Sequence, residues 1–132
     1  MATYFSSENA LVTWDDELAG VVMQWKGEVH DSAEFRNVIQ KELELIEQKR
    51  PRKLYLDMRK MGFILPEDQA WLREYWDPRA VASGLKLVAM VVPERSMPRQ
   101  LLPILTEAGT EEGLIIQYFW EPDAARKWLM GS

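Results

Sequence analysis

Short runs of β-forming residues alternate with longer segments of helical spacing over most of the chain. Strands that alternate with helices form βαβ units, in which the crossovers are right-handed and the strands are parallel. The beginning of the chain differs, because the β-rich runs at about 10–15 and 20–26 stand close together and predict a hairpin. We therefore expect an α/β fold with one mixed sheet, in which the later strands at about 53–58, 85–92 and 114–119 are parallel.

The helical segments carry recognisable start and stop signals. Asp31 is a suitable N-cap of the first helix, and Glu34 follows three residues later, as in a capping box. Pro66 suits the first turn of the second helix, where a missing N–H has no consequence. We expect Asp77-Pro78 to interrupt the second helix and Pro103 to kink a third helix that Ser96 caps. A short last helix follows the final strand.

Length and composition set the scale of the fold. The chain has 132 residues, of which 47% are hydrophobic, so one domain over residues 1–132 with a sizeable core is expected. The run LKLVAMVV (85–92) is apolar at nearly every position, which is typical of a strand buried on both faces.

Charge and residue content exclude several classes of function. The net charge of −5 argues against nucleic acid, whose binding depends largely on a basic surface. The chain has no cysteine, which excludes disulfides and thiolate chemistry, and we expect no metal or other cofactor. We see no signal peptide and no apolar run near the roughly 20 residues of a membrane helix, so we expect a cytoplasmic protein without membrane insertion. The sequence does not decide between a monomer and a homodimer.

The carboxyl ends of parallel strands are where open α/β sheets bind ligands. At these ends the sequence places the charged residues Asp57, Arg59, Glu67, Arg95 and Glu121, with Met58, Met61 and Phe63 nearby, and Trp71 follows on the apolar face of the second helix. Each type also has a structural interpretation. An acid at a strand end commonly caps the following loop, as Asp57 would, and acids such as Glu67 and Asp68 complement a helix N-terminus. His30, the only histidine, precedes the helix cap and is no obvious base.

Six tryptophans raise the question of an apolar ligand site. Burial in the core is the ordinary explanation for such residues. The alternative is a cleft lined by Met61, Phe63, Trp71 and Trp76, which would hold a small apolar molecule.

The order of several motifs resembles the SpoIIAA-like, or STAS, superfamily, and in particular its small stand-alone bacterial members, many of which have no assigned function. The motifs are WKG (25–27), LDMRKMG…LPEDQAWL (56–72), WDPRA (76–80), GLKLVAMVVPE (84–94) and YFWEPDAARKWL (118–129). The resemblance implies a mixed sheet of four or five strands with helices mainly on one side. It also implies a non-catalytic domain that binds a partner through the strand-to-helix corner, here residues 57–67.

The anti-sigma factor antagonists of this superfamily carry a phosphorylatable serine at the corner. No Ser or Thr occurs between Tyr55 and Arg79, so we expect no such switch there. Phosphorylation of Ser83 or Ser96 is left open.

Three functions follow in order of preference. The first is a non-enzymatic regulatory module that contacts a protein through the corner. The second is a carrier of a small apolar, lipid-like ligand, for which the topology shared with CRAL-TRIO domains is an analogy. The third, an enzyme that uses Asp57 and Arg59, is remote.

Overall fold

One mixed sheet forms the centre of the molecule. The structure, a computed structural model, describes residues 2–29, 31–61, 64–93, 108–109 and 113–131. The sheet has seven strands in the order β1-β2-β3-β4-β5-β7-β6. They are β1 (Ala2–Ser6), β2 (Ala10–Asp15), β3 (Gly20–Trp25), β4 (Lys53–Asp57), β5 (Leu87–Val91), β6 (Ala108–Gly109) and β7 (Ile115–Phe119).

The pairing of the strands confirms the predicted hairpin and the predicted parallel strands. β2 and β3 are antiparallel, whereas β4 runs parallel to both β3 and β5, and β7 runs parallel to β5. The expected number of four or five strands is wrong. Strand β1 adds an antiparallel edge, and the two residues of β6 add another beside β7. The residues of β1 are exposed or half-buried, and β6 has only two residues, so neither shows a clear apolar pattern in the sequence.

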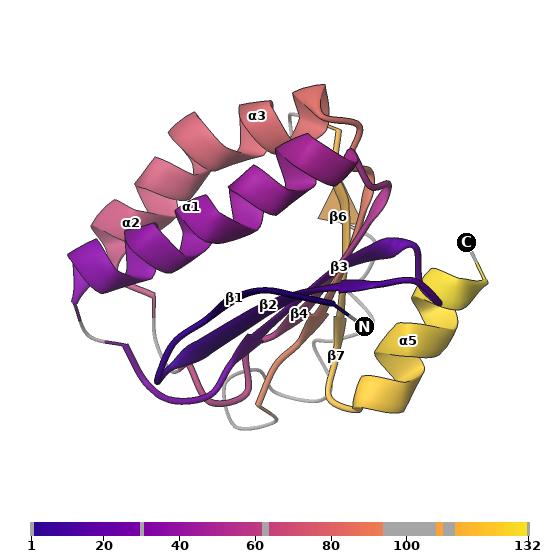
Figure 1. The fold of residues 1–132 in the computed structure, drawn as a ribbon, viewed down its shortest axis with the longest axis horizontal. Coiled ribbons are helices and arrows are strands. Elements are labelled where there is room, and N and C mark those ends of the chain that lie inside the picture. Colours follow the sequence, from indigo (N-terminus) through magenta and orange to yellow (C-terminus); the bar gives the residue numbers. More distant parts are fainter. Residues whose placement is uncertain (1, 30, 62–63, 94–107, 110–112, 132) are drawn as a thin grey trace.

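The helices lie on both faces of the sheet, with most of them on one face (Figure 1). Helix α1 (Ser32–Lys49) contacts β1, β2 and β3. Next to it lie α2 (Pro66–Trp71), the π-helical turn η1 (Leu72–Trp76) and α3 (Asp77–Ala82), which follow one another without a break and which we call the α2–α3 rod. Helix α5 (Pro122–Met130) covers the other face, against β4, β5 and β7.

The predicted interruption at Asp77-Pro78 is wrong, because the rod continues through it. The backbone N–H of Asp77 bonds to the carbonyl of Leu72, five residues back, instead of four. This wider turn shifts the hydrogen-bond register just before Pro78, which then lies in the first turn of α3, where no N–H is needed. The proline is therefore accommodated by a π-helical turn and does not end the helix.

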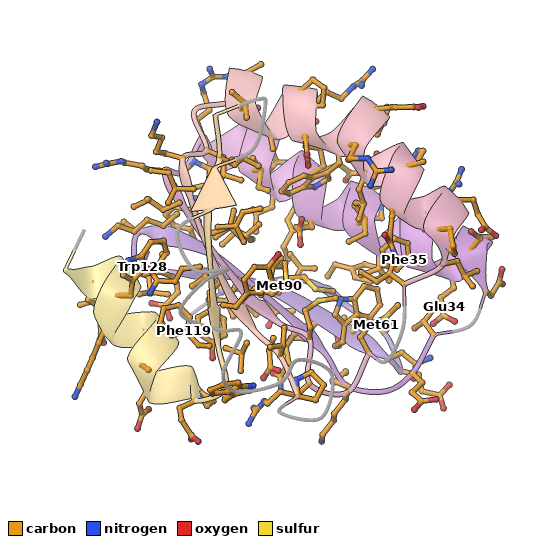
Figure 2. All side chains as sticks on the ribbon, turned by 180° about the vertical axis from the view of Figure 1, so that it is seen from behind. Glu34, Phe35, Met61, Met90, Phe119 and Trp128 are labelled. Atoms are coloured by element: carbon orange, nitrogen blue, oxygen red, sulfur yellow. The ribbon has the colours of Figure 1, made fainter. Side chains whose placement is uncertain are left out.

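The two faces of the sheet bury two separate cores. Val88 and Met90 of β5 pack with the core below α1, whereas Leu87, Ala89 and Val91 pack with the core below α5. Figure 2 shows the same division, with Phe35, Met61 and Met90 on one side and Phe119 and Trp128 beside α5. The prediction that β5 is buried on both faces is thus confirmed.

The start of α1 follows its prediction in part. The side chain of Asp31 accepts a hydrogen bond from the N–H of Ala33, as an N-cap does. The Glu34 carboxylate accepts a hydrogen bond from Asn9 at 3.0 Å and so ties α1 to the loop before β2. The predicted third helix, with Ser96 and Pro103, lies outside the described residues.

Candidate functional site

Asp57 and Arg59 form a closed pair at the end of β4. The buried carboxylate of Asp57 accepts hydrogen bonds from the backbone N–H of Arg59 at 3.1 Å and from its Nε and Nη2 at 3.0 and 2.8 Å. These hydrogen bonds raise the pKa of the Arg59 guanidinium above its ordinary value. Asp57 thus has the loop-capping role that its position indicated, while the side chain of Arg59 is 45% exposed.

The structure does not bring the other predicted site residues together. Met61 is buried in the core below α1, and Glu67 is exposed at the start of α2. Trp71 is half-buried and stacks on Tyr75, with 5.2 Å between the ring centroids. The guanidinium of Arg36 lies over the Trp71 ring at 5.2 Å. The remaining candidates, Phe63 and Arg95, lie outside the described residues, as does His30.

Asp68 has a role that the sequence did not indicate. As expected, it lies in the first turn of α2, where an acid complements the helix dipole, but its side chain is buried. Its carboxylate accepts a hydrogen bond from the hydroxyl of Ser32 and pairs with Nε of Arg36 at 2.9 Å. Both partners belong to α1, so Asp68 fixes the start of the α2–α3 rod against α1.

A cavity of about 810 Å³ lies between the sheet and the helices of the α1 face. Its walls come from β3, β4, β5 and β7 on one side and from α1 and the α2–α3 rod on the other. The described lining residues are Trp25, Phe35, Ile39, Glu42, Leu56, Met58, Ile64, Gln69, Leu72, Arg73, Glu74, Trp76, Asp77, Val88, Met90, Leu114 and Ile116. Most are apolar or aromatic, which is typical of a small-molecule site.

The arrangement of the helices explains where this cavity lies. Helix α1 rests on β1 to β3, whereas the α2–α3 rod makes its main helix contact with α1, through α3. The rod thus reaches over the side of the sheet that α1 leaves open (Figure 1). Within the cavity wall, Trp25 and Phe35 stack almost parallel, at 7° and with 5.6 Å between the ring centroids.

Glu42 is a buried acid in this otherwise apolar wall. It belongs to α1, is 1% exposed, and its Oε2 has no hydrogen-bond partner among the described residues. Burial raises the pKa of Glu42 from 4.5 to about 8, so the carboxyl group is largely protonated at neutral pH. The nearby indole of Trp76 opposes this rise, although its N–H does not reach hydrogen-bond geometry with any described group.

Two indole N–H groups of the wall are unpaired as well. Nε1 of Trp25 and Nε1 of Trp76 are buried and make no hydrogen bond within the described part of the chain. Buried polar groups are nearly always paired, since leaving one unpaired costs about 1–3 kcal/mol. These polar atoms also have almost no accessible surface, so they lie behind the cavity wall and not on it.

The sequence predicted only some of the residues that line this cavity. Of the four residues expected to form an apolar cleft, Trp76 lines it, whereas Met61 and Trp71 are not among the lining residues. Glu42 was missed, although a signal was present. It follows Ile39 by three residues and Val38 by four, so it stands on the apolar stripe of its helix.

Ser83 is buried, and its hydroxyl donates a hydrogen bond to the carbonyl of Arg79 at 3.0 Å. A kinase would have to open the end of α3 to reach it. Ser96, the second serine considered for phosphorylation, lies outside the described residues.

No protein-family model, no curated protein and no solved structure matches the chain. The STAS superfamily therefore stays a resemblance. Among the described residues, no helix has the length and apolar character needed to span a bilayer.

Proposed function

We propose that this protein binds a small, largely apolar molecule in the cavity between its sheet and its α1 face. The observation that carries the proposal is a cavity of about 810 Å³ whose walls are mostly apolar. Small-molecule sites commonly have volumes of about 300–1,000 Å³ and this composition.

The cavity is partly open to solvent, so a small molecule can enter it from the surface. Its walls are mostly apolar, and a bound apolar molecule would remove this surface from water.

We propose binding in preference to catalysis. The remote enzymatic alternative rested on Asp57 and Arg59, which pair with each other, and neither is among the residues that line the cavity. A binding module is also what the STAS resemblance implies.

Protein binding through the corner is a second proposal, favoured by one observation. Asp57 holds the half-exposed guanidinium of Arg59 in a defined orientation at the surface. Ordered arginines are frequent among the residues that dominate protein interfaces.

Titration with the neutral fluorescent probe N-phenyl-1-naphthylamine tests the cavity. We expect saturable binding with enhanced probe fluorescence. Ile116→Trp, which places a larger side chain into the cavity, should abolish it. The matched control is Ile115→Trp, because Ile115 is also half-buried in β7 but faces the α5 core. Equal probe binding by both folded variants would contradict the proposal.

A further inference from the structure

We propose that one end of the molecule docks onto an anionic membrane surface through five basic residues. We call them the basic end, and they are Lys49, Arg50, Arg52, Lys53 and Lys86. The choice of a membrane as the anionic partner rests on the proposed function, since a largely apolar ligand dissolves in lipid bilayers.

The basic end combines two segments that contain no acid. The run KRPRK (49–53) joins α1 to β4, and Lys86 directly precedes β5. Residues 48–56 and 78–93 include no Asp or Glu. In a chain with 21 acidic residues and 16 Lys and Arg residues, these two segments are therefore basic although the protein as a whole is acidic.

The fold brings the two segments together at the amino ends of β4 and β5. The carbonyl of Arg52 accepts hydrogen bonds from the backbone N–H groups of Lys86 and Leu87, both at 3.0 Å. Arg50 is the C-cap of α1, and its Nη2 donates a hydrogen bond to the carbonyl of Ala82 at the end of α3, at 3.1 Å. The ends of α1 and α3 therefore lie side by side at this end of the molecule (Figure 1).

Most of these charges are not used inside the protein. The side chains of Arg52, Lys53 and Lys86 form no hydrogen bond or ion pair with any other described residue. All members of the basic end are exposed except Lys53, which is half-buried. Like charges that gather without partners repel one another, so their arrangement does not stabilise the fold. It is suited to a surface that meets an anionic partner.

Two of the three acids at the neighbouring β2–β3 turn are paired elsewhere. This turn lies at the same end of the sheet, because Gly20 pairs with Lys53. Asp15 and Glu17 both contact the guanidinium of Arg126 in α5, at 3.0 and 3.4 Å. Their charges are thus partly balanced by a cation that is not part of the basic end.

The net charge of −5 does not prevent such docking. Strand β4 has five residues, and a parallel strand rises about 3.3 Å per residue, so the opposite edge of the sheet lies roughly 13 Å away. Charges in about 0.1 M salt are screened over about 10 Å. Acids at that edge, such as the exposed Glu121, therefore weaken the field of the basic end only slightly.

A membrane suits the basic end better than an acidic protein does. Anionic lipids attract clusters of Lys and Arg by charge alone, without a fixed geometry and without insertion into the bilayer. Only Arg50 has its side chain fixed by a hydrogen bond. Protein interfaces, in contrast, depend on a few ordered anchors.

Sedimentation with lipid vesicles tests the inference. We expect the protein to sediment with vesicles of equal parts phosphatidylcholine and phosphatidylglycerol in about 0.1 M salt, and to be released in about 1 M salt. It should stay in solution with vesicles of phosphatidylcholine alone. The double variant Arg52→Gln/Lys86→Gln should lower the partition onto anionic vesicles by roughly twenty- to thirtyfold, because each cation near the surface contributes about fivefold.

The matched control is Lys26→Gln/Lys60→Gln, which changes the net charge equally. Lys26 follows β3 and Lys60 follows β4, so both lie at the opposite edge of the sheet, and both are exposed. This control should partition onto anionic vesicles within about twofold of the parent. Both double variants should bind N-phenyl-1-naphthylamine like the parent, since none of the four residues lines the cavity.

The outcomes separate the inference from the proposed function. Failure to sediment with anionic vesicles overturns the inference and leaves an acidic protein as the partner to seek. Equal loss of partition in the two double variants also overturns it, because net charge and not the basic end would then govern binding. Absence of N-phenyl-1-naphthylamine binding contradicts the proposed function, whereas docking is decided by the vesicles alone.

Discussion

Nε of Arg36 in α1 lies 2.9 Å from Oδ1 of Asp68 in α2, in an ion pair whose acid is buried and whose base is half-exposed. The hydroxyl of Ser32 donates to the same oxygen. Asp68 is 32 positions from Arg36 and 36 positions from Ser32 along the chain, so these contacts join the beginnings of two helices that are distant in sequence. Because the α2–α3 rod forms one wall of the cavity, this pair fixes the position of that wall.

Removal of the Asp68 carboxylate should therefore lower the stability of the protein. We expect Asp68→Ala to lower the free energy of unfolding by about 2–3 kcal/mol, since two hydrogen bonds to a charged group are lost while Arg36 can still reach water. Urea denaturation measures this. Glu67→Ala, at the exposed neighbouring position, should change stability by less than about 0.5 kcal/mol. Equal midpoints for the two variants would show that the pair does not hold the rod.

Glu42 should make the stability of the protein depend on pH. Its folded-state pKa of about 8 lies above the ordinary value of 4.5, so between these values the native state binds a proton that the unfolded state has lost. Stability should then fall as pH rises through this window, by up to roughly 1.4 kcal/mol per pH unit, and level off above about pH 8. Denaturation midpoints from pH 5 to 9 measure the slope.

Glu42→Gln supplies the matched comparison for this slope. The amide does not titrate, so Glu42→Gln lacks this loss of stability. Relative to the parent, the variant should become more stable as the pH rises to about 8. A difference that is constant over the whole range would show that the Glu42 carboxyl group ionises in the native protein as it does in water.

Arg59 separates the corner from the cavity. We expect Arg59→Ala to cost about 1–2 kcal/mol, because buried Asp57 loses its guanidinium but keeps its hydrogen bond to the backbone N–H of residue 59. Binding of N-phenyl-1-naphthylamine should be unchanged, since Arg59 does not line the cavity. Lys60→Ala, at an exposed neighbouring position, is the control for stability. A loss of probe affinity in Arg59→Ala would mean that corner and cavity are coupled.

Elements with local signals can be predicted from the amino-acid sequence. The apolar run of β5 is buried on both faces, as its composition indicates, and Asp31 caps α1 where the first helical pattern begins. Pro66 occupies the first turn of α2. Periodicity, capping residues and proline act over a few residues, and the crossover rule then makes the later strands parallel. These features can be deduced without knowledge of any distant contact.

The burial of polar residues, in contrast, depends on contacts between distant parts of the chain. Glu42 and Asp68 are both acids on helices, yet Asp68 is paired with Arg36 while Oε2 of Glu42 has no partner among the described residues. The hydrogen-bond shift at Leu72 that carries the rod past Pro78 is likewise not evident from local propensity. The burial of these groups depends on how α1 and the rod meet over the sheet. Side chains from distant parts of the chain supply or withhold partners, so desolvation, pKa and the cavity itself are properties of the assembled fold.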